Sequence, residues 1–120
     1  MKIGLLGFGF MGRTHAWCVD NLKYFYKDLP FSAEIAAVSA SRPETTSKAA
    51  DFLGVKGATE DEIINDPSID IIDICTPNVY HYETLKKAIK RRCTGSAVLL
   101  RENSVLAWSF LLIVHKNLDF

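Results

Sequence analysis

The sequence is poor in cysteine and histidine, and this shortage argues against two classes of small protein. Its three cysteines are Cys18, Cys75 and Cys93. An odd number at such wide spacing suits neither a disulfide framework nor a zinc site, so we expect reduced thiols and a cytoplasmic protein. The three histidines also stand far apart in the chain, and no metal site is predicted.

The chain has no net charge, because its 14 basic residues balance its 14 acidic ones. A neutral chain without single-sign blocks has no general affinity for nucleic acid or anionic membranes. We expect the N-terminal Met-Lys-Ile to belong to the first strand rather than to a secretory signal. The apolar run at residues 105–114 is shorter than the roughly 20 residues that span a bilayer. If uncovered, this run would promote self-association.

What the sequence does contain is a glycine-rich loop, Gly7-Phe8-Gly9-Phe10-Met11-Gly12, directly after the apolar residues 3–6. The glycines of such a loop serve three different purposes, which are a tight turn, close approach of the backbone to a pyrophosphate, and close packing of the next helix. The start of that helix directs free N–H groups and a positive dipole at the anion. The loop residues expected to bind a dinucleotide are Gly7, Gly9, Phe10, Met11 and Gly12.

The rest of the chain alternates between apolar runs and amphipathic segments. Strands are expected at residues 3–6, 35–38, 55–58 and 69–75, and helices at 14–29, 43–53, 59–66 and 80–91. Pro43 should start a helix, Gly54 should end it, and Thr59 with Glu62 should form a capping box. Leu85, Ala88 and Ile89 should face inward. This order predicts one α/β domain with a doubly wound, Rossmann-like parallel sheet, with an incomplete sheet as the alternative.

Several short motifs in this order give the chain a family resemblance. They are Gly12-Arg13-Thr14-His15, Ser41-Arg42-Pro43-Glu44, Asp66-Pro67-Ser68-Ile69-Asp70, and Thr76-Pro77-Asn78 followed by His81 and Leu85-Lys86-Lys87-Ala88. With them, residues 1–90 resemble the N-terminal NAD(P)-binding domain of the glucose-fructose oxidoreductase / inositol dehydrogenase (Gfo/Idh/MocA) family. The resemblance implies that Thr76, Pro77, Asn78 and, less directly, His81 border the nicotinamide half of the cofactor.

Ser41 and Arg42 bear on the choice of cofactor. Ser41 stands where NAD-preferring relatives carry an acidic residue for the ribose 2′-hydroxyl. Without that carboxylate NADP is admissible, and Arg42 could also stack on adenine. The alternative is that Arg42 is a solvated turn residue, so the expected cofactor is NADP or NAD, with a slight preference for NADP.

The resemblance fails after about residue 90. Relatives continue into a fifth strand that ends in a Glu-Lys-Pro motif, whose lysine lies beside the reacting carbon, and into a second domain with an acid/base histidine. This sequence contains neither. We therefore divide it into a Rossmann domain, 1–90, and an anomalous tail, 91–120. A frameshift or misjoined end is the favoured explanation of the tail, and a divergent fifth strand over residues 97–101 is the alternative.

Three further polar residues have local interpretations. His15 precedes the core-facing Ala16, and it would pack the helix, bond a nearby loop or touch the cofactor. Asp73 is an odd polar residue within a buried strand, with no partner visible in the sequence. Cys75 is interpreted as a small core hydrophobe. No catalytic residue is assigned to this chain.

The predicted function is nicotinamide-dinucleotide binding. Such a domain forms the N-terminal portion of an oxidoreductase that transfers hydride to or from a sugar, cyclitol or similar polyol, and we expect this chain to be inactive alone. Two alternatives remain at this point. One is a non-catalytic nucleotide-sensing or protein-interaction module that uses the tail as its partner surface, and the other is an incomplete fragment without function.

Overall fold

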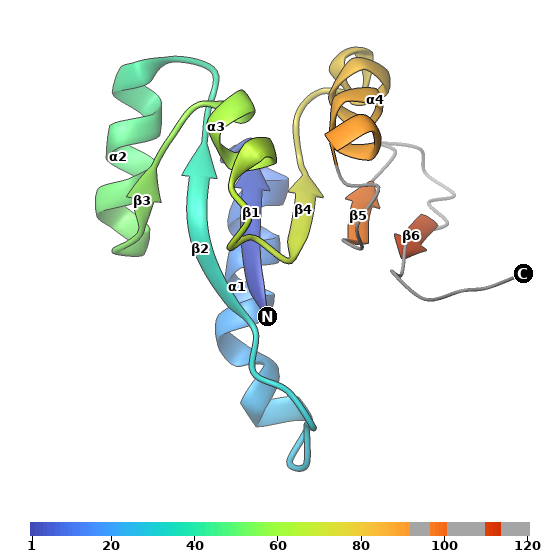
Figure 1. Cartoon of the computed structure of the whole chain (residues 1–120). Helices are drawn as coiled ribbons and strands as arrows, with labels where there is room; N and C mark the ends of the chain where they lie inside the picture. Colours follow the sequence, from blue (N-terminus) through green and yellow to red (C-terminus); the bar gives the residue numbers. More distant parts are fainter. Residues whose placement is uncertain (92–96, 101–109, 114–120) are drawn as a thin grey trace, which may run out of the picture.

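The computed structural model describes residues 1–91, 97–100 and 110–113 of the chain. In Figure 1 their strands form one twisted sheet in the order β3-β2-β1-β4-β5-β6. The strands are β1 (Lys2–Leu6), β2 (Glu34–Ser39), β3 (Lys56–Gly57), β4 (Ile71–Ile74), β5 (Ala97–Leu100) and β6 (Phe110–Ile113). All neighbouring pairs are parallel except β5 with β6. The predicted α/β class and parallel Rossmann-like sheet are confirmed.

Helices cover both faces of this sheet. They are α1 (Phe10–Phe25), α2 (Pro43–Leu53), α3 (Glu60–Asn65) and α4 (His81–Arg91), with a short 3-10 helix, η1 (Asn78–Tyr80), before α4. In Figure 1, α1 lies behind β1 whereas α3 lies in front of it. Two apolar clusters correspond to the two faces. One joins β1 and β2 to α1 and α2, and the other joins the sheet to α3 and α4.

The central strand β1 shows why both faces must be covered. Leu5 and Leu6 are consecutive, so their side chains point to opposite faces, and yet they are 0% and 1% exposed. Leu5 belongs to the cluster with Ala16 of α1, whereas Leu6 belongs to the cluster with Ile63 of α3. Continuous apolar strands of this kind are typical of parallel sheets buried on both sides.

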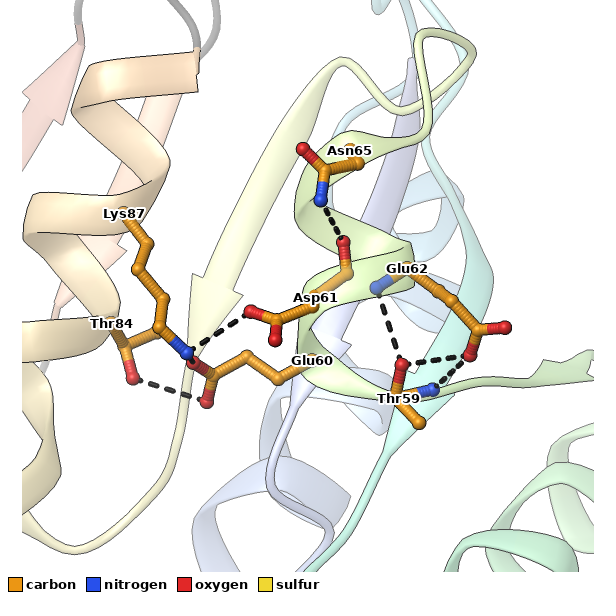
Figure 2. A network of polar contacts seen from close by, with 7 residues as sticks. All are labelled: Thr59, Glu60, Asp61, Glu62, Asn65, Thr84 and Lys87. Carbon is orange, nitrogen blue, oxygen red and sulfur yellow. Dashed lines mark hydrogen bonds and ion pairs between the residues drawn. The ribbon is translucent and has the colours of Figure 1, made fainter.

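The predicted helix ends are confirmed at three places. Pro43 is the first residue of α2, and Gly54 ends it in the left-handed conformation with φ +66°. Thr59 caps α3: the Glu62 backbone N–H donates to Thr59 Oγ1 at 3.3 Å, and the Thr59 N–H donates to Glu62 Oε2 at 2.8 Å (Figure 2). This reciprocal pair is the capping box expected from the sequence.

An ion-pair cluster links α3 to α4. Lys87 Nζ lies 3.1 Å from Glu60 Oε1 and 3.0 Å from Asp61 Oδ1, and the Thr84 hydroxyl donates to Glu60 Oε2 at 3.2 Å (Figure 2). These hydrogen bonds raise the pKa of Lys87, with the bond to Asp61 the larger cause. Because Lys87 is half exposed, the cluster adds only modest stability.

The structure departs from the predicted element bounds in several details. α1 begins at Phe10, since the glycine loop leads directly into it, and it ends at Phe25 because Tyr26 adopts extended backbone with φ −129°. The prediction that Ile89 faces inward is wrong: it is 43% exposed, while Ala88 is fully buried. The inward stripe of α4 is therefore narrower than predicted.

The tail is described only in part. β5 pairs parallel with β4, from Ile71 opposite Ala97 to Ile74 opposite Leu100. Of the apolar run at 105–114, only Phe110–Ile113 lies within the described residues. Residues 92–96, 101–109 and 114–120, with His115, lie outside them. The division at residue 90 and the frameshift hypothesis stay predictions. Among the described residues, no helix has the length and apolar character needed to cross a membrane.

Candidate functional site

Three loops meet at the carboxyl edge of the sheet, where the strands β2, β1 and β4 end side by side. Backbone hydrogen bonds hold them together: the Gly7 N–H donates to the Ser39 carbonyl at 2.8 Å, and the Cys75 N–H donates to the Leu6 carbonyl at 2.7 Å. In chain order the strands run outward from β1 to β3 on one side and then continue with β4 on the other. This reversal between β1 and β4 is where open α/β sheets bind ligands.

Gly7 makes the turn that leaves β1. Its φ is +99°, which L side chains rarely adopt. A Cβ at this position would also lie 2.7 Å from the Cys75 carbonyl oxygen and 2.9 Å from the Thr76 nitrogen. Glycine is therefore required here both by backbone conformation and by the close passage of the loop after β4.

Gly12 and Gly9 are glycines for different reasons. A Cβ at Gly12 would lie 2.0 Å from the Gly7 carbonyl oxygen, so α1 packs directly on the loop. A Cβ at Gly9 would meet no protein atom within 4 Å, and its φ of −79° suits any residue. Nothing in the described part of the chain requires glycine at position 9, which leaves open space over the loop for a ligand.

The N-terminus of α1 offers hydrogen-bond donors to that space. Gly9 caps the helix without a side-chain hydrogen bond, and the first turn holds no acidic residue. The side chain of Phe10 is 83% exposed, so it stands clear of the core. The first N–H groups and the positive dipole end of a 16-residue helix are thus directed at a potential anion.

Ser41 and Arg42 follow β2 at the same edge, and both are exposed. Arg42 is the N-cap of α2: its backbone N–H donates to Thr45 Oγ1 at 3.1 Å. The segment between β2 and α2 carries no carboxylate, since the first acidic residue is Glu44 in the first turn of the helix. Residues 40–42 themselves therefore place no carboxylate where it would repel a 2′-phosphate.

The third loop runs from Thr76 to His81. The His81 Nε2–H donates to the Thr76 carbonyl at 2.6 Å, and His81 is only 9% exposed as it begins α4. This histidine therefore positions the Thr76-Pro77-Asn78 segment. The Thr76 hydroxyl oxygen is buried and has no hydrogen-bond partner among the described residues, and Asn78 is exposed in η1.

A polar cluster that the sequence did not reveal lies beneath the glycine loop. His15 Nδ1, from α1, donates to Asp73 Oδ2 of β4 at 2.8 Å, and Cys75 Sγ lies 3.3 Å from the same nitrogen. Asp73 thus has a partner, and Cys75 has polar neighbours besides its apolar ones. The available signal was the two-residue spacing, because Asp73 and Cys75 point to the face of the sheet that α1 covers.

Comparison with known proteins identifies the family. The model of the Gfo/Idh/MocA family, described as "Oxidoreductase family, NAD-binding Rossmann fold", matches residues 1–100. The chain belongs to this family, as the resemblance predicted.

Individual relatives with similar sequences or structures are dehydrogenases. Levoglucosan dehydrogenase from Pseudarthrobacter phenanthrenivorans is 34% identical over 85 residues, 69% of this chain and 22% of the relative. Myo-inositol 2-dehydrogenase from Thermotoga maritima is 31% identical over 94 residues, 77% of this chain and 26% of the relative. The solved complex of levoglucosan dehydrogenase with NADH and levoglucosan superposes with a TM-score of 0.73 at 30% identity, covering 82% of this chain and 26% of that one. This chain therefore spans about a quarter of the length of these relatives.

Proposed function

We propose that residues 1–90 bind a nicotinamide dinucleotide across the carboxyl edge of the sheet. The observation that carries the proposal is the open space at Gly9, where the N-cap of α1 supplies no side-chain hydrogen bond and no contact of the described chain requires glycine. Gly7, Phe10, Met11 and Gly12 would complete the cradle for the pyrophosphate, with backbone N–H groups as donors.

The two flanking loops would hold the two ends of the cofactor. Ser41 and Arg42 lie at the end of β2, where the adenosine ribose of such a cofactor would be bound. Because the segment between β2 and α2 has no carboxylate to repel a 2′-phosphate, we propose that the site takes NADP as well as NAD, with a slight preference for NADP. Thr76, Pro77 and Asn78 would border the nicotinamide, and His81 would keep them in place through the Thr76 carbonyl. The buried Thr76 hydroxyl, which has no partner among the described residues, would gain one from the cofactor.

The activity of the whole protein is proposed from its relatives. Their names include dehydrogenases of levoglucosan and of inositols, so a sugar, cyclitol or similar polyol is the proposed substrate class. When bound, the nicotinamide supplies the hydride chemistry, and the protein supplies position and a proton-transfer group. The 120 residues contain no Glu-Lys-Pro sequence, so we expect them to bind cofactor without turnover.

Thermal unfolding of the full chain with each cofactor tests this proposal. A ligand that binds only the folded state raises the midpoint temperature as its concentration rises. We expect such a rise with both NADP and NAD, slightly larger with NADP. A cooperative transition that neither cofactor moves would contradict the proposal. Unfolding without cooperativity would also contradict it, because it would mean that the chain forms no stable pocket.

A further inference from the structure

Three different metal-ligating atoms converge beneath the glycine loop. His15 Nδ1 lies 3.1 Å from Asp73 Oδ1 and 3.3 Å from Cys75 Sγ, and Cys75 Sγ lies 3.5 Å from Asp73 Oδ1. The three atoms therefore form a nearly equilateral triangle. They come from α1, from β4 and from the residue directly after β4, and one ligand atom of each residue lies within 4.8 Å of the others.

The size of this triangle matches one face of a zinc tetrahedron. Nitrogen, oxygen and sulfur ligands at their usual distances from tetrahedral Zn²⁺ are about 3.3 to 3.6 Å apart. A triangle with a mean edge of about 3.3 Å has its centre about 1.9 Å from each corner, so a Zn²⁺ ion at 2.0–2.3 Å would lie just outside the plane of the donors. The three donor atoms are thus already spaced as ligands of one ion, and the Nδ1 hydrogen bond to Asp73 Oδ2 must break when the ion binds.

The charge of the cluster also fits a divalent cation. The Asp73 side chain is only 4% exposed, and its side-chain partners include His15 Nδ1 and Cys75 Sγ. A buried carboxylate is costly unless it is compensated by a partner. A carboxylate, a thiolate and a neutral imidazole together carry two negative charges, which one divalent ion neutralises.

A cation has access to the cluster from solvent. The His15 side chain is 19% exposed, and Cys75 is partly exposed, whereas Asp73 lies deepest. Three protein ligands leave the fourth tetrahedral position for water. The thiolate and imidazole favour Zn²⁺ over Mg²⁺ or Ca²⁺, since the latter two prefer oxygen ligands.

We infer that His15, Asp73 and Cys75 form a binding site for Zn²⁺ or a chemically similar divalent ion. On binding, the Cys75 S–H bond breaks, its proton leaves to solvent and a sulfur–metal bond forms. The imidazole proton that Nδ1 now donates to Asp73 moves to Nε2, so that one proton is released for each ion and no oxidant or reductant is needed. None of the three residues is among the proposed dinucleotide contacts, so the inference does not depend on that proposal.

Titration of the reduced full chain with Co²⁺, in the absence of nucleotide, tests the inference. Co²⁺ in a tetrahedral site with a thiolate ligand gives a near-ultraviolet charge-transfer band and strong visible bands. We expect these bands to saturate at one ion per chain, to be displaced by Zn²⁺, and to be accompanied by release of one proton. A folded chain that gives no such bands would overturn the inference.

Cysteine variants provide the controls. Cys75→Ser should weaken Co²⁺ binding by about a hundredfold or more and abolish the charge-transfer band, because loss of a ligand costs at least as much as loss of its supporting contacts. The Cys18→Ser, Cys93→Ser double variant should keep both the affinity and the band, as Cys18 is exposed and is not one of the three converging ligands. Asp73→Asn should weaken binding while it retains the band. If the double variant loses the band, or Cys75→Ser keeps it, the assignment is wrong. Far-ultraviolet circular dichroism identifies variants that fail to fold.

Discussion

His15 and Asp73, which are 58 positions apart in the chain, join α1 to β4 through a hydrogen bond of 2.8 Å from Nδ1 to Oδ2. Both residues lie under the glycine loop, so this bond holds the start of α1 against the strand that carries the third loop of the site. The carboxylate is nearly inaccessible to water, with a side chain 4% exposed. Its imidazole partner is therefore needed for stability as well as for position.

Replacing His15 should destabilise the fold. We expect His15→Ala to lower the free energy of unfolding by about 1–3 kcal/mol, because it leaves the buried Asp73 without its partner. Urea unfolding of His15→Ala, Asp73→Asn and the double variant measures the coupling between the two residues. The double variant should lose less than the two single losses combined. Purely additive losses would show that the hydrogen bond contributes nothing.

Gly9 and Gly12 should respond differently to alanine. Gly9→Ala should lower the stability of the fold only slightly, through a poorer N-cap, since its Cβ meets no protein atom, yet weaken binding of NADP and NAD by about tenfold or more. Gly12→Ala should lower stability as well, because its Cβ would lie 2.0 Å from the Gly7 carbonyl oxygen. Calorimetric titration and thermal unfolding separate the two effects, with Ser47→Ala on α2 as control. Unchanged cofactor affinity in Gly9→Ala would argue against the pyrophosphate cradle.

Arg42 should discriminate between the two cofactors. If its guanidinium meets the 2′-phosphate, Arg42→Ala should weaken NADP binding about tenfold and leave NAD binding within about twofold. Lys48→Ala removes the same charge from the exposed face of α2 and is the matched control. Competitive titration with both cofactors measures the ratio. Equal losses for NADP and NAD would mean that Arg42 does not recognise the 2′-phosphate.

The capping box of α3 should make the stability of the fold depend on pH in the acidic range. Hydrogen bonds from Thr59, the backbone N–H first, hold the pKa of Glu62 below its ordinary value. The ionised Glu62 side chain therefore stabilises the folded state at pH values above its unfolded pKa, which is about 4.3 for glutamate. This stabilisation is lost as the pH falls through the lower pKa of the folded state. The wild type should exceed Glu62→Gln in stability at neutral pH, and the difference should close below about pH 4.3. Glu34→Gln, at an exposed strand residue outside the capping box, is the control.

Much of the fold could be predicted because its signals are local. Pro43, Gly54 and the Thr59–Glu62 pair act within a few residues of themselves, and each marks a helix end where the structure has one. The exposure of Ile89 was not predicted, because it depends on contacts that are not local in the sequence. How wide a stripe of a helix is covered depends on its neighbours in space, which helical periodicity alone does not reveal.

The candidate site, too, has one part that could be predicted from the sequence and one part that could not. The glycine loop was visible because backbone conformation and close packing restrict the residue types at positions 7 and 12. The cluster of His15, Asp73 and Cys75 was not, since it arises only when α1 folds back over β4. In the sequence each of the three residues had an ordinary local interpretation, and only their juxtaposition gives them a shared chemistry.

The two backbone hydrogen bonds at the sheet edge have a consequence for ligand recognition. Gly7 is tied to Ser39 and Cys75 to Leu6, so each of the three loops begins at a point anchored to its neighbour. Loops anchored in this way lose little conformational freedom when a ligand arrives, and more of the contact energy appears as affinity. The edge of the sheet would therefore act as a preorganised receptor for the proposed nucleotide.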